Sequence, residues 1–207
     1  MLASLMVKLF DRWSDWRDGA LDRTYGIETC DLVATPQGIG EHSAHGVRYQ
    51  PIQLDVFRRI MAALAIDPKG YTFVDYGSGK ARALVLAAEY GFRRIIGVEY
   101  ASALHDMARR NVARYSAANP AAAAIELHWA DAASFDLPDE DLLCFFYNPF
   151  DDVVMRKVLS NLERSLQRRP RRVLIVYRNP QHASLLSECR FLRCLVRNPT
   201  FEIHQAN

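Results

Sequence analysis

The sequence predicts an α/β domain in which a largely parallel sheet is covered by helices on both faces. From residue 52 onward, short and continuously apolar segments alternate with segments whose apolar residues recur at helical spacing. Such strands are typical of parallel sheets buried on both faces. Two further strand-like segments lie close together at the end of the chain and predict a terminal antiparallel hairpin. The 207 residues suffice for one domain of this kind.

Each element of this doubly wound domain follows from a local pattern. Apolar, β-prone runs predict strands over residues 71–76, 95–98, 125–129, 142–147 and 173–177, followed by hairpin strands over 191–196 and 201–204. Apolar spacing predicts helices over residues 56–64, 81–90, 104–115, 155–166 and 183–187. The turn Asp67-Pro68-Lys69-Gly70 ends the first of these helices.

We expect residues 1–51 to form a helix and an entry segment, ahead of the domain at residues 52–207. Apolar residues between Leu2 and Trp16 recur at helical spacing and predict an amphipathic helix. Its apolar face would pack on the domain or on a second subunit, as in a homodimer. Acidic residues argue against a membrane-surface helix. Residues 24–51 show no clear period and are interpreted as an ordered lid.

Composition excludes several classes of protein. The formal net charge of +2 argues against a dedicated nucleic-acid binder, and arginines 168–172 are interpreted as complementing a helix dipole. No signal peptide and no apolar run of roughly 20 residues is visible. The four cysteines form no CxxC pair, which favours a reducing, cytoplasmic location. No metal site is expected, because His42 and His45 lack a third ligand and Cys189 and Cys194 are interpreted as packing residues.

The strongest motif is a glycine-rich loop between the first strand and the next helix. It reads Phe-Val-Asp-Tyr-Gly-Ser-Gly-Lys-Ala-Arg over residues 73–82. Glycines allow tight turns and let a ligand touch the backbone, and the helix start offers unpaired N–H groups. A turn without a ligand is the alternative. The loop predicts a ligand at the carboxyl end of this strand, at the switch point of the sheet.

Glu99 ends the second strand about 20 residues after the loop, where an acid can accept both hydroxyl protons of a ribose. Loop and acid together indicate a cofactor that contains a nucleoside. A dinucleotide fingerprint would place its third glycine at Arg82, and a Walker loop would place Ser or Thr at Ala81. Neither phosphate-binding motif fits, and the Tyr-x-x-x-Lys motif of a nicotinamide oxidoreductase is absent.

Over roughly residues 71–204, the chain resembles class I S-adenosylmethionine-dependent methyltransferases. Asp75-x-Gly77-x-Gly79 and Glu99 are similar to the family's first two motifs, although Ala81 stands where the family has a third glycine. The resemblance implies a Rossmann-like, seven-stranded sheet with one antiparallel strand, and S-adenosylmethionine as cofactor. The candidate cofactor-binding residues are Asp75, Gly77, Ser78, Gly79, Glu99, Tyr100, Asp131 and Ala132.

Residues 147–150, Tyr-Asn-Pro-Phe, follow the fourth strand, where the family places its catalytic motif. If the acceptor is an amine, Asn148 and the Tyr147 or Pro149 carbonyl would accept its N–H bonds, while Phe150 and Tyr49 would wall the pocket. Pro149 is expected to hold Asn148 extended. The alternative, which we weigh equally, is that Pro149 is an ordinary loop proline after a strand and that the motif has no catalytic role.

A narrower resemblance rests on Tyr49-Gln50-Pro51, the glycine loop and Arg82, which are similar to some seven-strand protein-lysine methyltransferases. It implies methylation of an amine nitrogen such as that of a protein lysine, and a small-molecule amine is the other acceptor that we expect. A catalytically inactive protein that binds S-adenosylmethionine for regulation or scaffolding is the alternative.

Overall fold

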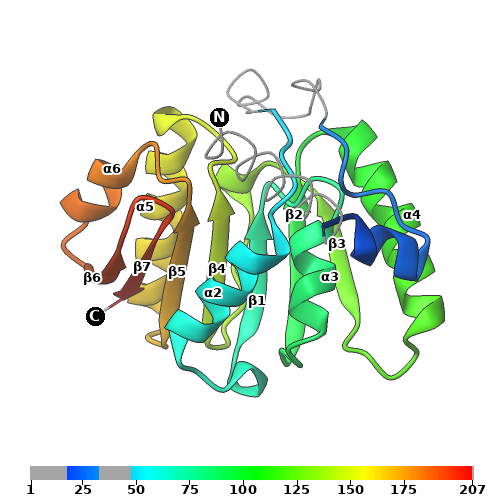
Figure 1. The fold of residues 1–207 in the computed structure, drawn as a ribbon. Coiled ribbons are helices and arrows are strands. Elements are labelled where there is room, and N and C mark those ends of the chain that lie inside the picture. The colour runs from blue at the N-terminus through cyan, green and yellow to red at the C-terminus, as the bar shows by residue number, and fades with distance from the viewer. Residues whose placement is uncertain (1–17, 33–47, 207) are drawn as a thin grey trace, which may run out of the picture.

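A computed structural model describes residues 18–32 and 48–206 and has the predicted α/β fold. Seven strands form one sheet in the order β3-β2-β1-β4-β5-β7-β6 (Figure 1). The strands are β1 (Thr72–Tyr76), β2 (Arg94–Glu99), β3 (Ile125–Trp129), β4 (Leu142–Tyr147), β5 (Val173–Arg178), β6 (Leu192–Arg197) and β7 (Phe201–Ala206). The predicted strands are thus confirmed to within two residues at their ends.

The predicted terminal hairpin is confirmed, since β6 and β7 pair antiparallel. β7 also pairs antiparallel with β5, and the pairs among the first five strands are parallel. The chain builds outward from β1 to β3 and then crosses back to β4 on the other side of β1. The carboxyl ends of β1 and β4 therefore lie side by side at the switch point, where open α/β sheets bind ligands.

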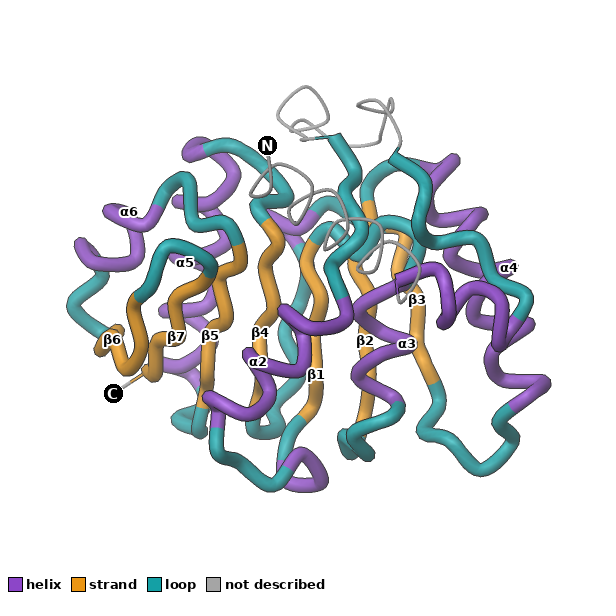
Figure 2. Tube along the Cα trace, in the orientation of Figure 1, coloured by secondary structure: helices purple, strands orange, loops and turns teal. Residues whose placement is uncertain are grey.

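Helices cover both faces of the sheet (Figure 2). Successive strand residues face opposite sides, so Phe73 enters the core beneath α2, α3 and α4, and Val74 enters the core beneath α5 and α6. The α-helices are α2 (Leu54–Leu64), α3 (Arg82–Ala88), α4 (Ser102–Ala118), α5 (Asp152–Arg168) and α6 (Ala183–Glu188), and the 3-10 turns are η2 (Pro68–Gly70) and η3 (Ala132–Ser134).

The described N-terminal residues lie on the α3 and α4 side of the domain. Residues 18–25 are helical, and the segment after them contacts α4, where Asn111 accepts the Glu28 N–H and donates to the Glu28 carbonyl. The amphipathic helix predicted between Leu2 and Trp16, and His42 and His45, lie outside the described residues. Within the described part of the chain, no helix has both the length and the apolar character needed to cross a bilayer.

Candidate functional site

The glycine loop turns the chain from β1 into α3 through three left-handed residues. Gly77, Gly79 and Ala81 have φ angles of 76°, 54° and 72°. Ala81 is the N-cap of α3, so the helix begins one residue later than predicted. A left-handed conformation costs an alanine roughly 1–2 kcal/mol compared with a right-handed one. Alanine in place of the family's third glycine therefore carries a cost in backbone conformational energy. Its helix propensity gives no compensation, because Ala81 lies outside the helix.

Two side chains from elsewhere in the chain occupy the space that the loop glycines leave. A methyl group on Gly77 would collide with Pro149, and one on Gly79 would collide with the ring of Tyr49. The Tyr49 hydroxyl donates to the Thr29 carbonyl at 2.8 Å, and Lys80 lies 5.4 Å from the ring centre. The glycine loop is therefore packed against two side chains, one that follows β4 and one from the N-terminal segment.

Glu99 is buried and ties the glycine loop to the end of β2. Its Oε2 accepts the Gly79 N–H at 2.8 Å, and its Oε1 accepts the Ala101 N–H at 2.9 Å. Burial raises the pKa of Glu99, against the effect of these backbone N–H groups. Each carboxylate oxygen has a second lone pair, so the residue keeps acceptor capacity for a ligand. Glu99 is thus a structural part of the loop as well as a candidate ligand.

Asp75 is the least compensated charge of the site. Its carboxyl group is buried near the carboxyl end of β1, and within the described residues it has no hydrogen-bond or ion-pair partner. Burial, with a smaller contribution from Glu99, raises the pKa of Asp75 to about 8. The Ser78 hydroxyl is also buried without a partner. Buried polar groups are almost always paired, so these exceptions indicate a place for a ligand.

A cleft joins these groups to the end of β4. It contains about 590 Å³ of space between protein atoms, counting the part that opens to solvent. Ten predicted site residues line it: Tyr49, Asp75, Gly77, Ser78, Gly79, Glu99, Tyr100, Tyr147, Asn148 and Pro149.

Three predicted site residues lie elsewhere. Phe150 is buried in the α5 side of the core, with its ring centre 6.1 Å from that of Phe146. This corrects the expectation that Phe150 walls the pocket: Pro149 faces Gly77, and the chain then turns its next side chain into the core beneath α5. Asp131 caps the turn η3 by accepting the Ala133 N–H at 2.9 Å, and neither it nor Ala132 lines the cleft.

Asn148 is not extended, which corrects the expectation drawn from Pro149. Its φ angle is 42°, in the left-handed region that asparagine tolerates better than most residues. The Tyr177 hydroxyl donates to the Asn148 Oδ1 at 3.3 Å and accepts the His182 N–H at 3.3 Å. Tyr177 was not singled out from the sequence. The available signal was its place near the end of β5, the strand beside β4.

Arg82 and Lys80, beside the glycine loop, are two further residues that were not assigned to the site from the sequence. Arg82 is only 2% exposed and binds the N-terminal segment: its guanidinium donates to the Ile52 and Asp18 carbonyls and the Thr29 hydroxyl, and pairs with Asp18 at 3.2 Å. The Lys80 ammonium donates to the Asp31 carbonyl at 2.9 Å. Both cations hold residues 18–32, whose Thr29 carbonyl accepts from Tyr49, close to the glycine loop, instead of facing a phosphate.

Comparison with known proteins gives the fold independently. No family model and no curated protein matches the sequence. Among solved structures, an RNA methyltransferase from Salinibacter ruber bound to S-adenosyl-L-homocysteine is 17% identical, with a TM-score of 0.52 over 75% of this chain and 92% of that one. A ribosomal protein L11 methylase from Lactobacillus delbrueckii subsp. bulgaricus is 14% identical, with a TM-score of 0.51 over 73% and 76%.

A SAM-dependent methyltransferase from Aquifex aeolicus is likewise 14% identical, with a TM-score of 0.52 over 73% of this chain and 88% of that one. The shared feature is the α/β arrangement, because identities this low carry little residue-level information. With its seven strands, its switch point between β1 and β4 and its antiparallel β7, the chain has the Rossmann-like fold of class I methyltransferases.

Proposed function

We propose that this protein is an S-adenosylmethionine-dependent methyltransferase. One observation carries the proposal: two buried carboxyl groups, Asp75 and Glu99, line one cleft with the glycine loop at the switch point of the sheet. The Salinibacter ruber protein, similar in fold, is a methyltransferase that binds S-adenosyl-L-homocysteine. A ligand that brings positive charge and hydroxyl donors would compensate both carboxyl groups.

The residues present fit this cofactor. S-adenosylmethionine carries a sulfonium, an ammonium group and a ribose with two hydroxyls. Asp75, without a partner in the described residues, is suited to the cationic methionine part, and the free lone pairs of Glu99 are suited to the ribose. We keep Asp131 and Ala132 as the candidate adenine contacts on the adjoining turn. Tyr49 covers Gly79, so it must shift before a ligand can touch the Gly79 backbone.

Catalysis would depend on alignment. The bound cofactor supplies a methyl group on a positively charged sulfur, which needs no further activation, and the chain contributes orientation and exclusion of water. Asn148 lines the cleft with Tyr147 and Pro149. Its amide oxygen, held by Tyr177, would accept an N–H bond from an amine acceptor and direct the nitrogen lone pair at the methyl group. A protein lysine, entering deprotonated, is the acceptor that the Tyr49-Gln50-Pro51 segment favours.

We also infer that residues 18–32 and 48–51 cover this cleft. Arg82 and Lys80 bind residues 18–32, and Tyr49 lies against Gly79. A catalytically inactive protein that binds the same cofactor is the alternative, and it predicts cofactor binding without turnover on any acceptor.

Calorimetry tests the cofactor assignment. S-adenosylmethionine should bind, whereas NAD and ATP should not, and Asp75→Asn should weaken binding at least tenfold, since a charged hydrogen bond contributes about 1.5–3 kcal/mol. The matched control is Asp106→Asn on the exposed face of α4, which should bind like the wild type. Binding of NAD alone, or equal affinity in Asp75→Asn, would contradict the assignment. A radiolabelled methyl-transfer screen over lysate protein, RNA and metabolites then identifies the acceptor class.

A further inference from the structure

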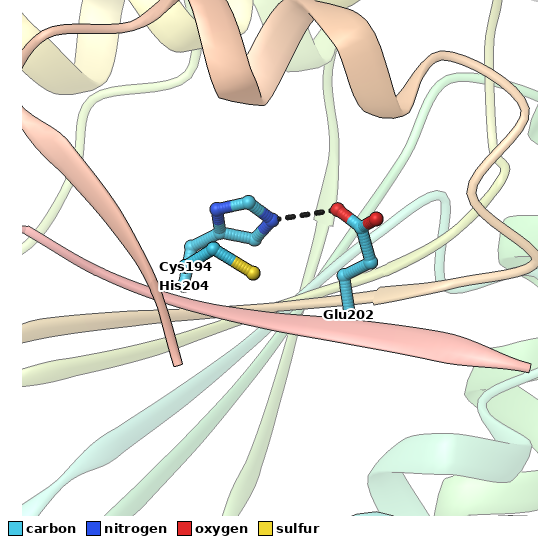
Figure 3. A group of neighbouring side chains, drawn as sticks. All are labelled: Cys194, Glu202 and His204. Carbon is cyan, nitrogen blue, oxygen red and sulfur yellow. Dashed lines mark hydrogen bonds and ion pairs between the residues drawn. The ribbon is translucent and has the colours of Figure 1, made fainter. Parts of the chain in front are cut away.

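Three side chains that commonly bind metals share one face of the terminal hairpin. Cys194 on β6 is paired directly opposite His204 on β7, and Glu202 lies two residues before His204. Side chains two apart on a strand, and those directly opposite in an antiparallel pair, point to the same face. The Cys194 sulfur, a Glu202 oxygen and a His204 ring nitrogen all lie within 4.8 Å of one another (Figure 3).

Two of the three donors are buried and already oriented. His204 is 1% exposed and Glu202 is 3% exposed, whereas Cys194 is exposed at the edge of the sheet. The His204 Nε2 lies 2.8 Å from the Glu202 Oε2. Arg197 holds the other oxygen of the same carboxylate at 2.8 Å. The carboxylate therefore has a fixed orientation, with one oxygen directed at the histidine.

The third donor lies at an irregularity of the hairpin. The pairing of β6 with β7 shifts between Cys194 and Val196, as at a β-bulge. Bulges re-aim side chains and are frequent at functional positions on sheet edges. The Cys194 Sγ contacts the Val196 carbonyl at 3.5 Å, a weak interaction that a stronger partner can replace.

We propose that Cys194, Glu202 and His204 bind a zinc ion. Sulfur, imidazole nitrogen and carboxylate oxygen are the three donor types that zinc accepts, and three protein ligands leave the fourth tetrahedral position to water. Calcium and magnesium prefer oxygen ligands only, so this set disfavours them. The exposed Cys194 provides the entry path. The proposal differs from the expectation of no metal site, which rested on sequence spacing and did not use cross-strand pairing.

Binding would exchange protons for the ion. The Cys194 thiol proton leaves to solvent, because the thiolate is the ligand. The proton that His204 Nε2 shares with Glu202 moves to Nδ1, so the imidazole stays neutral and Nε2 binds the ion through its lone pair. The hydrogen bond between His204 and Glu202 is replaced by bonds from both residues to the same ion, and Arg197 keeps its carboxylate oxygen as an outer partner. None of these residues lines the cleft, so the zinc proposal does not depend on the methyltransferase proposal.

Cobalt substitution tests the site on the full chain without a purification tag. Co²⁺ should bind one per chain and give the intense visible absorption of a tetrahedral site together with a thiolate-to-cobalt band. Cys194→Ala, an exposed position that should leave the fold intact, should abolish the thiolate band and weaken zinc binding at least tenfold against a chromophoric chelator. The control is Cys189→Ala, whose thiol contacts the Leu185 carbonyl outside the cluster.

A second readout uses the link between binding and stability. Zinc in excess should raise the melting temperature of the wild type and of Cys189→Ala, and should raise that of Cys194→Ala much less. A weak octahedral cobalt spectrum, or equal zinc affinity in the wild type and Cys194→Ala, would overturn the proposal.

Discussion

Two Asn-Pro dipeptides end neighbouring strands of the sheet, and only one of them faces the cleft. Asn148-Pro149 follows β4 and Asn179-Pro180 follows β5, and the two asparagines have left-handed φ angles of 42° and 51°. The sequence element and the backbone conformation are therefore alike. The surroundings differ: Asn148 lines the cleft and accepts from Tyr177, whereas the Asn179 side chain accepts from Gln181 beside it.

The backbone turn at Asn148 is therefore a separate feature from any part that its side chain has in the cleft. A left-handed asparagine before proline suffices to end a strand, because both strands use it. Whatever activity Asn148 has must come from what its amide faces. Asn179 is thus an internal control for Asn148, because it has the same left-handed backbone conformation and does not line the cleft.

The largest expected effect concerns Asp75, the buried carboxyl group that lines the cleft with Asn148. Burial raises the pKa of Asp75 from its ordinary value of 3.8 to about 8, so between these values the folded state holds a proton that the unfolded state has lost. The contribution of this proton to the free energy of unfolding is fully present below pH 4 and is lost as the pH rises toward 8. In the range where the folded state binds one proton more than the unfolded state, the loss is about 1.4 kcal/mol per pH unit. Above pH 8 the loss stops.

Urea unfolding between pH 4 and pH 9 measures this slope. Asp75→Asn should flatten it by about one proton and leave the part due to Glu99, whose pKa burial also raises. Asp106→Asn, at an exposed position of α4, is the matched control. An unchanged slope in Asp75→Asn would mean that Asp75 is ionised in the folded protein.

The second prediction compares the two asparagines directly and rests on the proposed function. Asn148→Ala should lower kcat by roughly 10- to 100-fold and leave cofactor affinity nearly unchanged, because the lost hydrogen bond belongs to the transition state. Asn179→Ala should turn over like the wild type, although it loses a similar left-handed asparagine. Equal kcat values in the two variants would remove Asn148 from catalysis.

The third prediction concerns Tyr177, which holds the Asn148 oxygen at 3.3 Å. Tyr177→Phe should lower kcat by about fivefold, since one neutral hydrogen bond contributes roughly 1 kcal/mol. Cofactor affinity should not change, and Tyr177→Phe in an Asn148→Ala background should have no further effect on kcat. Tyr71→Phe, at the opposite end of the sheet beside Arg172, is the matched control. Additive losses in the double variant would show that Tyr177 acts without Asn148.

The smallest expected effect is a gain in stability. Glycine adopts positive φ without the steric cost that asparagine has, so Asn179→Gly should change the free energy of unfolding by no more than about 1 kcal/mol, toward stabilisation. Asn148→Gly should show a smaller gain, because the bond from Tyr177 that it loses is partly buried, whereas the bond from Gln181 that Asn179→Gly loses is exposed to water. Chemical denaturation measures both. A clear destabilisation by Asn179→Gly would show that its side chain contributes more than the backbone strain costs.

Much of the fold was predictable because it follows from local patterns. Continuous apolar runs gave β4 and β5 within one residue, and the closing pair of strands gave the antiparallel hairpin. Nine of the ten predicted site residues that line the cleft follow from the strand order, because the carboxyl ends of β1, β2 and β4 meet at one edge of a parallel sheet. The tenth, Tyr49, comes from the N-terminal segment. The direction of a loop side chain was not predictable in this way, which explains the error on Phe150.

Periodicity and turn residues act over short distances, so the elements, their order and the polar strand ends can be predicted from the sequence. Contacts between residues far apart in the chain become visible in the folded protein alone. Arg82 binds Asp18 and Thr29, Tyr49 covers Gly79, and Cys194 pairs across from His204. These contacts depend on the relative placement of whole elements and on strand register, and spacing along the chain contains neither.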